Sequence, residues 1–473
     1  VRKVMGSSKR QLLDQFLTES LITSFASLLF AVGLVSLLIQ PFEEITNSPI
    51  NYIILFNPLF ISIVLAFTML IGLLAGVYPA FLITSFKPVD ALKLGKVKLS
   101  GKKSPWIWKS LVVFQFATSI ILIICAIVVN KQHLFLLNKD MGFTKEQVVM
   151  MPIRGTSIKL RSEEFKVELF KNSSVISASA MSDILGNDVP LRPFLFQGQQ
   201  KSQNIPGLFA DFDFLKTFDL KLKNGRDFSI DLETDKEVFI INESAAQLWD
   251  STSWEGKSIV WSLKMRPVIG VVEDFHFADL KQEIRPFVIT YSPSWYAYMA
   301  IRIYSENIFQ SLKDIEATWN LFEPERPFTP FFLDDRLNNI YESERKISQM
   351  IGYFSVISIF LAALGLLGLT NYSTLLRVKE IGVRKVLGAS VLSILKLLSR
   401  DYAILVLIAN LVAWPAAWFF SREWLANFTF KIDINIWIFV IAGVASLLLS
   451  VLTICFQGLK TALLNPSSSL RSE

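Results

Sequence analysis

The sequence predicts an α-helical polytopic membrane protein with six transmembrane helices and one α+β domain outside the cytoplasm. Three observations predict it. The 473 residues are 52% hydrophobic and 19% charged, whereas soluble domains contain about 45–50% apolar and about 25% charged residues. The apolar residues are gathered into six runs, and the Lys and Arg residues alternate between the runs. One segment of about 215 residues, between the third run and the fourth, has the mixed charge of an ordinary folded domain.

Each apolar run is long enough to cross a bilayer core, which takes about 20 helical residues. In hydrocarbon only a helix or a closed barrel satisfies the backbone, and these continuous runs lack the alternation of barrel strands. Six helices are therefore expected at about 17–39, 59–83, 110–130, 349–376, 402–421 and 436–457.

Basic residues set the orientation of these helices. Four segments together hold 19 Lys and Arg residues against four acidic ones, and belong in the cytoplasm: 1–16, 84–109, 377–400 and 458–473. The loop 40–58 carries Glu43 and Glu44 but no basic residue, which suits the outer side. The net charge of +6 is therefore a topology signal, and it gives no reason to expect a nucleic-acid partner.

The long outer segment mixes strand and helix patterns. Residues 237–241 and 268–272 are β-rich, whereas 160–171 and 243–250 have helical patterns. The segment 334–348 is charged, with apolar residues at helical spacing, and predicts a stalk helix that runs into the fourth span. A solvated surface helix unconnected to that span remains the alternative.

An eight-residue pattern occurs twice. Val-Arg-Lys-Val-Met-Gly-Ser-Ser at 1–8 returns as Val-Arg-Lys-Val-Leu-Gly-Ala-Ser at 383–390. Each copy leads into a span, a polar outer loop, a second span and a cytoplasmic end, so residues 1–93 and 383–471 are two copies of one unit. The second copy follows a span, the outer domain and another span (110–376). We therefore expect the chain to be an N-terminally truncated fragment whose missing part ends in a span.

The repeated pattern resembles a known family. Val-Lys-Glu-Ile-Gly-Val-Arg-Lys-Val-Leu-Gly-Ala-Ser at 378–390 resembles the cytoplasmic signature of FtsX-like permeases of ABC transporters, and 1–8 resembles its other copy. The segments 270–277 and 332–337, with Phe114-Gln115-Phe116, resemble MacB-like periplasmic core sequences. The resemblance implies five parts: 1–93, the end of a first permease unit with a coupling segment at 1–16; 94–109, a basic linker; 110–130, a transmembrane helix; 131–347, a MacB-like periplasmic core domain; and 348–473, a second permease unit with a coupling segment at 377–400.

In that family the short helix after the signature docks on a separate cytoplasmic ATPase, so the resemblance implies an ABC ATPase dimer as partner. The basic residues would offer fixed charge, the neighbouring Ile and Val side chains an apolar surface, and the glycines tight turns or close backbone approach. A passive role, in which the basic residues only touch phospholipid, stays open, but it does not explain why the glycine repeats. The implied ATPase-coupling residues are Glu380, Gly382, Arg384, Lys385 and Gly388, with Arg2, Lys3 and Gly6 in the first copy.

Catalytic, metal and cofactor sites are not expected on this chain. Gly256-Lys257-Ser258 ends like a nucleotide-binding loop, but Ser251 stands where the first glycine is required, so ATP must be bound by a partner subunit. Asp274 and His276 are too few ligands for a closed zinc site, and a structural histidine is expected.

The sequence is compatible with two functions. The first is the permease subunit of an ABC transporter in the inner membrane, which passes ATP-driven motion to the outer domain and handles a lipoprotein, peptide, antibiotic or envelope enzyme, with a periplasmic adaptor or envelope protein as further partner. Mechanical transmission is favoured over conduction because the polar residues of the spans form no charged track: Glu19, Gln115, Asn371 and Asp401. The second is a membrane-anchored sensor or binding protein without ATP, which would have no need of a doubled cytoplasmic signature.

Overall fold

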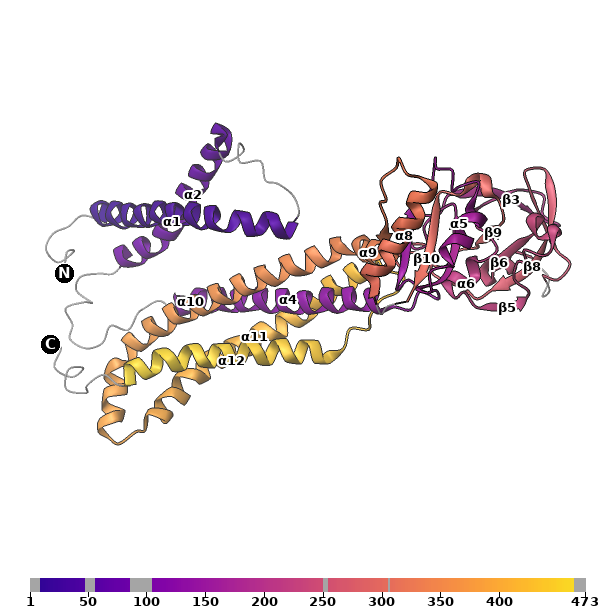
Figure 1. The fold of residues 1–473 in the computed structure, drawn as a ribbon. Helices are drawn as coiled ribbons and strands as arrows, with labels where there is room; N and C mark the ends of the chain where they lie inside the picture. The colour runs from indigo at the N-terminus through magenta and orange to yellow at the C-terminus, as the bar shows by residue number, and fades with distance from the viewer. Residues whose placement is uncertain (1–8, 47–55, 86–103, 250–253, 305–306, 463–473) are drawn as a thin grey trace. The chain divides into compact units, whose positions relative to one another are not determined.

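The computed structural model describes residues 9–46, 56–85, 104–249, 254–304 and 307–462. Within these ranges six helices are long and apolar enough to cross a membrane, with mean hydropathies of 2.0 to 2.8 over their spans. The prediction of six transmembrane helices is thus confirmed. They are α1 (Lys9–Thr46), α2 (Pro58–Ser85), α4 (Ser104–Asn138), α10 (Glu342–Val386), α11 (Val391–Leu425) and α12 (Ile436–Ala462) (Figure 1).

The chain divides into two compact units, one of residues 1–119, 356–409 and 446–473 and the other of residues 120–355 and 410–445. In the first unit α2 approaches α1 closely through a glycine. A Cβ atom on Gly76 would lie 2.7 Å from the Oγ of Ser20, nearer than van der Waals contact allows. Small residues at such a spacing let membrane helices pack backbone to backbone.

Polar side chains of the same unit join α4, α10 and α11 within the spans. Ser119 and Ser358 share a hydrogen bond of 2.6 Å between their hydroxyls. The Tyr402 hydroxyl donates to the carbonyl oxygen of Leu369 at 3.2 Å. These hydrogen bonds join neighbouring helices and help to hold the bundle together. They do not line a path across the bilayer.

The domain between α4 and α10 contains a four-stranded antiparallel sheet of order β11-β1-β10-β2. Two helices connect its strands, α5 (Ser162–Leu169) and α8 (Ile308–Phe322). The chain order β1-α5-β2 and β10-α8-β11 with this strand order is a split β-α-β arrangement. The strands are β1 (Val148–Pro152), β2 (Val175–Met181), β10 (Tyr298–Ile303) and β11 (Phe331–Phe332).

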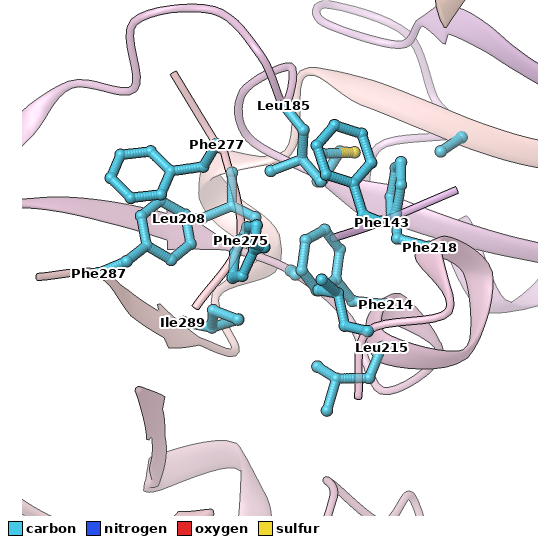
Figure 2. Packing of buried hydrophobic residues seen from close by; sticks show 14 of the residues in the cluster. Phe143, Leu185, Leu208, Phe214, Leu215, Phe218, Phe275, Phe277, Phe287 and Ile289 are labelled. Atoms are coloured by element: carbon cyan, nitrogen blue, oxygen red, sulfur yellow. The ribbon is translucent and has the colours of Figure 1, made fainter. Parts of the chain in front are cut away.

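Strand β1 reads Val-Val-Met-Met because both faces of the sheet are covered. Val149 and Met151 pack in a core with α5 and α8, whereas Val148 and Met150 point into a second core. The second core is rich in Phe and joins the sheet to the rest of the domain, as Figure 2 shows around Phe275 and Phe214. Burial on both faces explains why these strands are apolar runs without alternation.

Seven further strands lie between β2 and β10. Their order is β5-β8-β6-β9-β4-β3-β7, and β7 also pairs with β8, so six strands close into a barrel and β5 extends it. One short helix, α6 (Phe214–Phe218), packs in the second core. The strands are β3 (Leu191–Phe196), β4 (Gln203–Phe209), β5 (Leu222–Gly225), β6 (Phe239–Asn242), β7 (Ser258–Trp261), β8 (Lys264–Val272) and β9 (Val288–Thr290).

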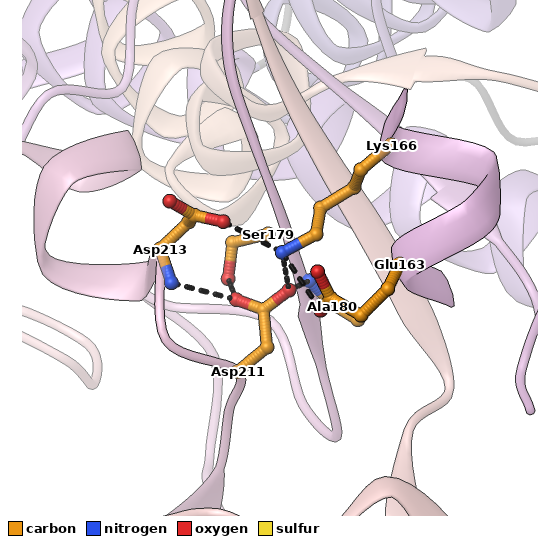
Figure 3. Close-up of polar contacts among 6 residues, drawn as sticks. All are labelled: Glu163, Lys166, Ser179, Ala180, Asp211 and Asp213. Carbon is orange, nitrogen blue, oxygen red and sulfur yellow. Dashed lines mark hydrogen bonds and ion pairs between the residues drawn. The ribbon is translucent and has the colours of Figure 1, made fainter. Parts of the chain in front are cut away.

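A buried ion cluster fixes α5 against the sheet (Figure 3). The Nζ of Lys166, whose side chain is 2% exposed, lies 2.9 Å from Asp211, 2.6 Å from Asp213 and 2.9 Å from Glu163. Asp211 also accepts hydrogen bonds from the Ser179 hydroxyl and a backbone amide. Burial alone would lower the pKa of Lys166, but the three carboxylates together raise it, so the ammonium stays charged.

The predicted strands and helices of this domain are present with adjusted ends. The stretches 237–241 and 268–272 fall on β6 and β8, and the pattern 160–171 on α5, while 243–250 contains only the four-residue α7 (Glu243–Ala246). The stalk expected over 334–348 is interrupted. Helix α9 (Leu333–Ile340) ends, Tyr341 forms a turn, and α10 then continues without a break into the fourth span.

Candidate functional site: a helix corner and a domain–helix junction

The repeated cytoplasmic pattern forms a corner between two long helices. Helix α10 ends at Val386, and Gly388 adopts a left-handed backbone conformation with φ of +88°. The amide of Ala389 donates to the carbonyl oxygen of Arg384 at 2.9 Å. This bond with a left-handed glycine is a Schellman C-cap, which terminates a helix and satisfies its last carbonyls.

The next residues of the pattern start the following helix. Ser390 precedes α11, and its hydroxyl accepts a bond of 3.3 Å from the amide of Ser393, as an N-cap does. The Ser393 hydroxyl in turn donates to the carbonyl oxygen of Ser390 at 2.7 Å. The Gly-Ala-Ser part of the pattern therefore ends one helix and begins the next.

Five of the coupling residues predicted from the sequence lie in the part of the chain that the structure describes. Glu380, Gly382, Arg384 and Lys385 lie in the last turns of α10, and Gly388 lies in the corner. Gly382 is inside a continuous helix, so of the two roles suggested for it the tight turn was wrong, and close backbone approach stays a prediction. No separate short helix follows the signature either, since α11 runs unbroken from Val391 to Leu425. Arg2, Lys3 and Gly6 lie outside the described residues.

The corner presents a hollow and an apolar tip. A hollow of about 350 Å³ is lined by Arg384, Leu387, Gly388, Ala389 and Ser393. Leu387 is 80% exposed beside it. The corner therefore places one exposed apolar side chain beside a partly cationic hollow.

A second constellation joins the domain to the membrane helices within the second unit. The loop between α11 and α12 carries Phe430, whose carbonyl oxygen accepts a bond of 2.8 Å from the amide of the buried Gln132 on α4. The Gln132 carbonyl oxygen accepts the amide of Ile432 at 3.0 Å. The Phe430 ring lies edge to face against His276 with centroids 4.6 Å apart, and the Lys139 ammonium is 4.9 Å from its centroid.

The first turn of α10 is fastened at the same junction. The Tyr341 hydroxyl accepts the backbone amide of Leu280 at 3.0 Å. The Lys281 ammonium lies 2.6 Å from the carboxylate of Glu344, whose side chain is 7% exposed. The Thr429 hydroxyl donates to the carbonyl oxygen of Lys281 at 2.7 Å. One loop of the domain, 279–284, therefore holds both α10 and the α11–α12 loop.

His276 has the structural role expected of it. Burial, with the nearby charge of Lys139, lowers the pKa of the ring, so it is neutral at physiological pH. Asp274 accepts the amide and the hydroxyl of Ser244 at 3.0 and 2.6 Å, as a cap for α7. In the part of the chain that the structure describes, no three His, Cys, Asp or Glu side chains are grouped to hold a metal ion.

Two segments of the chain match a family model. Residues 1–88 and 352–466 match the model described as FtsX-like permease C-terminal. Over these segments the chain is similar to FtsX-like permeases. Both matched segments contain a copy of the repeated pattern, and the second one contains the whole corner. The six apolar helices, with the folded domain between α4 and α10, are those of a multi-pass membrane protein with an extracytoplasmic domain.

Curated relatives carry a transport name. The chain is 25% identical over 286 residues to the macrolide export ATP-binding/permease protein MacB of Haemophilus ducreyi, covering 57% of this chain and 40% of that protein. It is 22% identical to the MacB protein of Chromobacterium violaceum, covering 55% of this chain and 42% of the relative. The chain thus spans about two fifths of the length of these relatives.

Three solved structures are similar to part of the chain. The periplasmic region of MacB from Actinobacillus actinomycetemcomitans is 15% identical with a TM-score of 0.32, covering 43% of this chain and 97% of that one. The extracellular domain of the ABC-type transporter YknZ from Gram-positive bacteria is 15% identical with a TM-score of 0.29, covering 38% and 95%. A domain of a permease protein from Porphyromonas gingivalis is 18% identical with a TM-score of 0.29, covering 40% and 93%.

Sequence reasoning missed the junction. Gln132, Lys281 and Phe430 belong to three separate segments, and no spacing rule brings them together. One signal was present, because Gln132 and His133 are polar residues at the outer end of an otherwise apolar helix. Polar residues at such positions mark functional contacts more often than chance.

Proposed function

We propose that this protein is an FtsX-like permease, the membrane subunit of an ABC transporter in the inner membrane. A separate cytoplasmic ATPase dimer would bind at the Arg384–Ser393 corner, and its ATP-driven motion would pass through α10 to the extracytoplasmic domain. The proposal is supported by the similarity to the family model, by the transport name of the relatives and by the exposed Leu387 at the corner. The handled substrate is an antibiotic, a peptide or a lipoprotein that the domain moves or presents.

The observation that carries the proposal is the continuity of α10. It is a single helix of 45 residues from the junction to the corner, about 67 Å long at 1.5 Å per residue. A helix without proline transmits displacement at one end to the other with little loss, because its hydrogen-bond ladder is uninterrupted. The bonds between the spans are lateral, which favours mechanical transmission over conduction.

The test is a site-specific crosslink at the corner. In membranes that contain the native partners, a Leu387→Cys variant carrying a photoreactive maleimide should capture a protein identified as an ABC ATPase by mass spectrometry. The yield should change with ATP and vanadate. The matched control is Leu263→Cys, which is 100% exposed but lies on the extracytoplasmic domain, and it should capture no ATPase.

A negative result of the crosslinking experiment is also informative. If Leu387→Cys captures no ABC ATPase while the control position labels normally, the chain acts without ATP, as a membrane-anchored sensor or binding protein would. If the ATPase is captured but hydrogen exchange in the loop 426–435 is unchanged by ATP and vanadate, the mechanical route through α10 is wrong.

A further inference from the structure

One end of the β-barrel in the extracytoplasmic domain carries two arginines. The interior of the barrel is filled by apolar side chains such as Phe194, Ile259, Val268 and Val288. Side chains of a strand alternate between faces, so a residue two positions from an interior one also points inward. Arg192 precedes Phe194 by two residues, and Arg266 precedes Val268 by two.

The strand register places both arginines at the same end. On strands β7 and β8, Ile259 pairs with Arg266. On strands β3 and β4, Arg192 pairs with Ile205. Phe209 pairs with Thr290 on the parallel strand, and Thr290 pairs with Phe239. These residues occupy the ends of their strands at one opening of the barrel, together with Trp261. We call this set, with Trp295, the barrel mouth: Arg192, Phe209, Phe239, Trp261, Arg266, Thr290 and Trp295.

Aromatic rings hold the two guanidinium groups. The Cζ of Arg192 lies 4.4 Å from the ring centre of Phe209 and 4.7 Å from that of Trp295. The Cζ of Arg266 lies 5.3 Å from the centre of Trp261. The three rings are in contact, because Phe209 is stacked on Trp295 with centres 5.4 Å apart and is tilted against Trp261 with centres 5.1 Å apart. Guanidinium stacked on rings keeps its in-plane N–H groups available for other bonds.

The arginines have few anionic partners. The Nη2 of Arg192 is 3.8 Å from Asp183, a long contact, and its Nε donates to the Gly207 carbonyl oxygen. Among the described residues Arg266 has no ion pair, and its Nη1 only reaches the Thr290 hydroxyl at 3.5 Å. Glu237 interacts electrostatically with Arg266, but its carboxylate is bonded to Lys264 at 2.6 Å.

One donor of the mouth is buried without a partner. The Nε of Arg266 has no hydrogen-bond acceptor among the described residues. Leaving a buried donor of a charged group unpaired is costly, and such groups are normally paired. Burial also lowers the pKa of Arg192, which shows that its charge is incompletely compensated. A cationic site of this kind is complementary to a carboxylate or a phosphate.

The rim of the mouth is apolar and exposed. Trp295 is 50% exposed and Leu263 100%. Ser262 and Leu263, at the tip of the β7–β8 hairpin, have φ of 51° and 66° although neither is glycine. Positive φ at both positions is the type I′ geometry of a two-residue hairpin, and it places Leu263 at the tip of the turn.

We propose that the barrel mouth binds a small anionic amphiphile, with its carboxylate or phosphate on Arg192 and Arg266 and its apolar body on Trp295 and Leu263. The site is distinct from the corner and the junction. Binding requires neither ATP nor an ATPase, so this proposal and the transport mechanism fail independently.

The experiment uses the full chain in nanodiscs of zwitterionic lipid. A diazirine-bearing decanoate is photolysed with the protein, and the labelled peptides are identified by mass spectrometry. Saturable labelling is expected on peptides that contain residues 258–272 and 291–297. Excess octanoate and octyl phosphate should both compete, and their relative potency distinguishes a carboxylate site from a phosphate site. Octanol and octyltrimethylammonium should not compete.

Variants separate the site from general charge. Arg192→Gln with Arg266→Gln should reduce labelling at the mouth at least tenfold, whereas Lys171→Gln with Lys223→Gln, an equal change of charge at exposed positions, should not. Arg192→Lys with Arg266→Lys keeps the charge and should retain part of the labelling, which guards against a folding defect in the glutamine variant. Labelling that is equal in the glutamine variant, or that octanol displaces as well as octanoate, would overturn the proposal.

Discussion

The Lys281–Glu344 ion pair allows the junction between the extracytoplasmic domain and α10 to be weakened by one side chain. Glu344 is 7% exposed and Lys281 35% exposed, with 2.6 Å between ammonium and carboxylate. In Lys281→Met the methylene stem stays but the buried carboxylate loses its cation and keeps only the Ser343 hydroxyl at 2.8 Å. Removing one partner of a buried pair costs about 3–5 kcal/mol. The partial exposure of Lys281 reduces this to about 2–3 kcal/mol.

The structure also predicts an asymmetry. In Glu344→Gln the remaining charge is on Lys281, which can reach solvent, so the loss should be about 1 kcal/mol. The double variant Lys281→Met with Glu344→Met removes both charges and should be close to the native protein, because replacing a buried pair by apolar groups is often neutral. A neighbouring pair supplies the control. Arg345 and Glu342 are 54% and 29% exposed, so Arg345→Met should cost less than about 0.5 kcal/mol.

Hydrogen exchange of the full chain measures the effect locally. The amides of residues 341–348 and the Leu280 amide bonded to Tyr341 report opening of the junction. A loss of 2–3 kcal/mol should accelerate their exchange by about 30- to 150-fold, since 1.4 kcal/mol is a factor of ten. Equal acceleration in Lys281→Met and Arg345→Met, or a double variant as impaired as Lys281→Met, would refute the reasoning.

Four further substitutions, one of them a control, test the corner, the domain and the bundle. Gly388→Ala should destabilise the corner by about 1–2 kcal/mol, because the φ of this residue is +88°. The control Gly352→Ala should stabilise α10 by up to about 1 kcal/mol, because nothing lies within 4 Å of a Cβ at that position. Hydrogen exchange in each segment measures the two effects separately. Burial raises the pKa of Asp227 to about 6, so its favourable contribution is complete below about pH 4 and is lost as pH rises through 6. Asp227→Asn should therefore raise the melting temperature at pH 7, by the equivalent of about 1–2 kcal/mol after solvent screening, and have little effect at pH 4. Asn410→Leu should destabilise the second unit by about 1–3 kcal/mol, because the buried Asn410 accepts the indole N–H of Trp414 at 3.1 Å; a melting temperature in detergent equal to that of the native chain would contradict this.

Much of the fold follows from periodicity alone. The six spans follow from continuous apolar runs, since hydrocarbon allows only helices or closed barrels and these runs lack the alternation of barrel strands, and each predicted span overlaps one of the six helices. The break at Tyr341 did not follow. The apolar spacing through Leu337 and Ile340 fits one helix as well as two, and the hydroxyl bond from Tyr341 to Leu280 that accompanies the turn is a tertiary contact.

The corner shows how far a repeated motif can be interpreted. The pattern predicted that its glycines matter but could not tell Gly382 from Gly388. A glycine inside a helix and one in a left-handed C-cap look the same until the helix end is known, and only the second carries a positive φ. The barrel could not be predicted from the sequence either, because its closure depends on β7 pairing with both β3 and β8.

The two ends of α10 are held in physically different ways, and the difference suits transmission. At the corner the chain direction is fixed by backbone geometry, through the Gly388 cap and the Ser390 start of α11, so a push on either helix moves the corner as one piece. At the junction α10 is fixed by side chains, a tyrosine hydroxyl bond and one ion pair, each worth a few kcal/mol at most. In the proposed mechanism, energy of that size is within reach of one ATP-driven step, whereas unwinding a 45-residue helix is not. Displacement would therefore be absorbed at the junction, where the domain can tilt on α10 without either part unfolding.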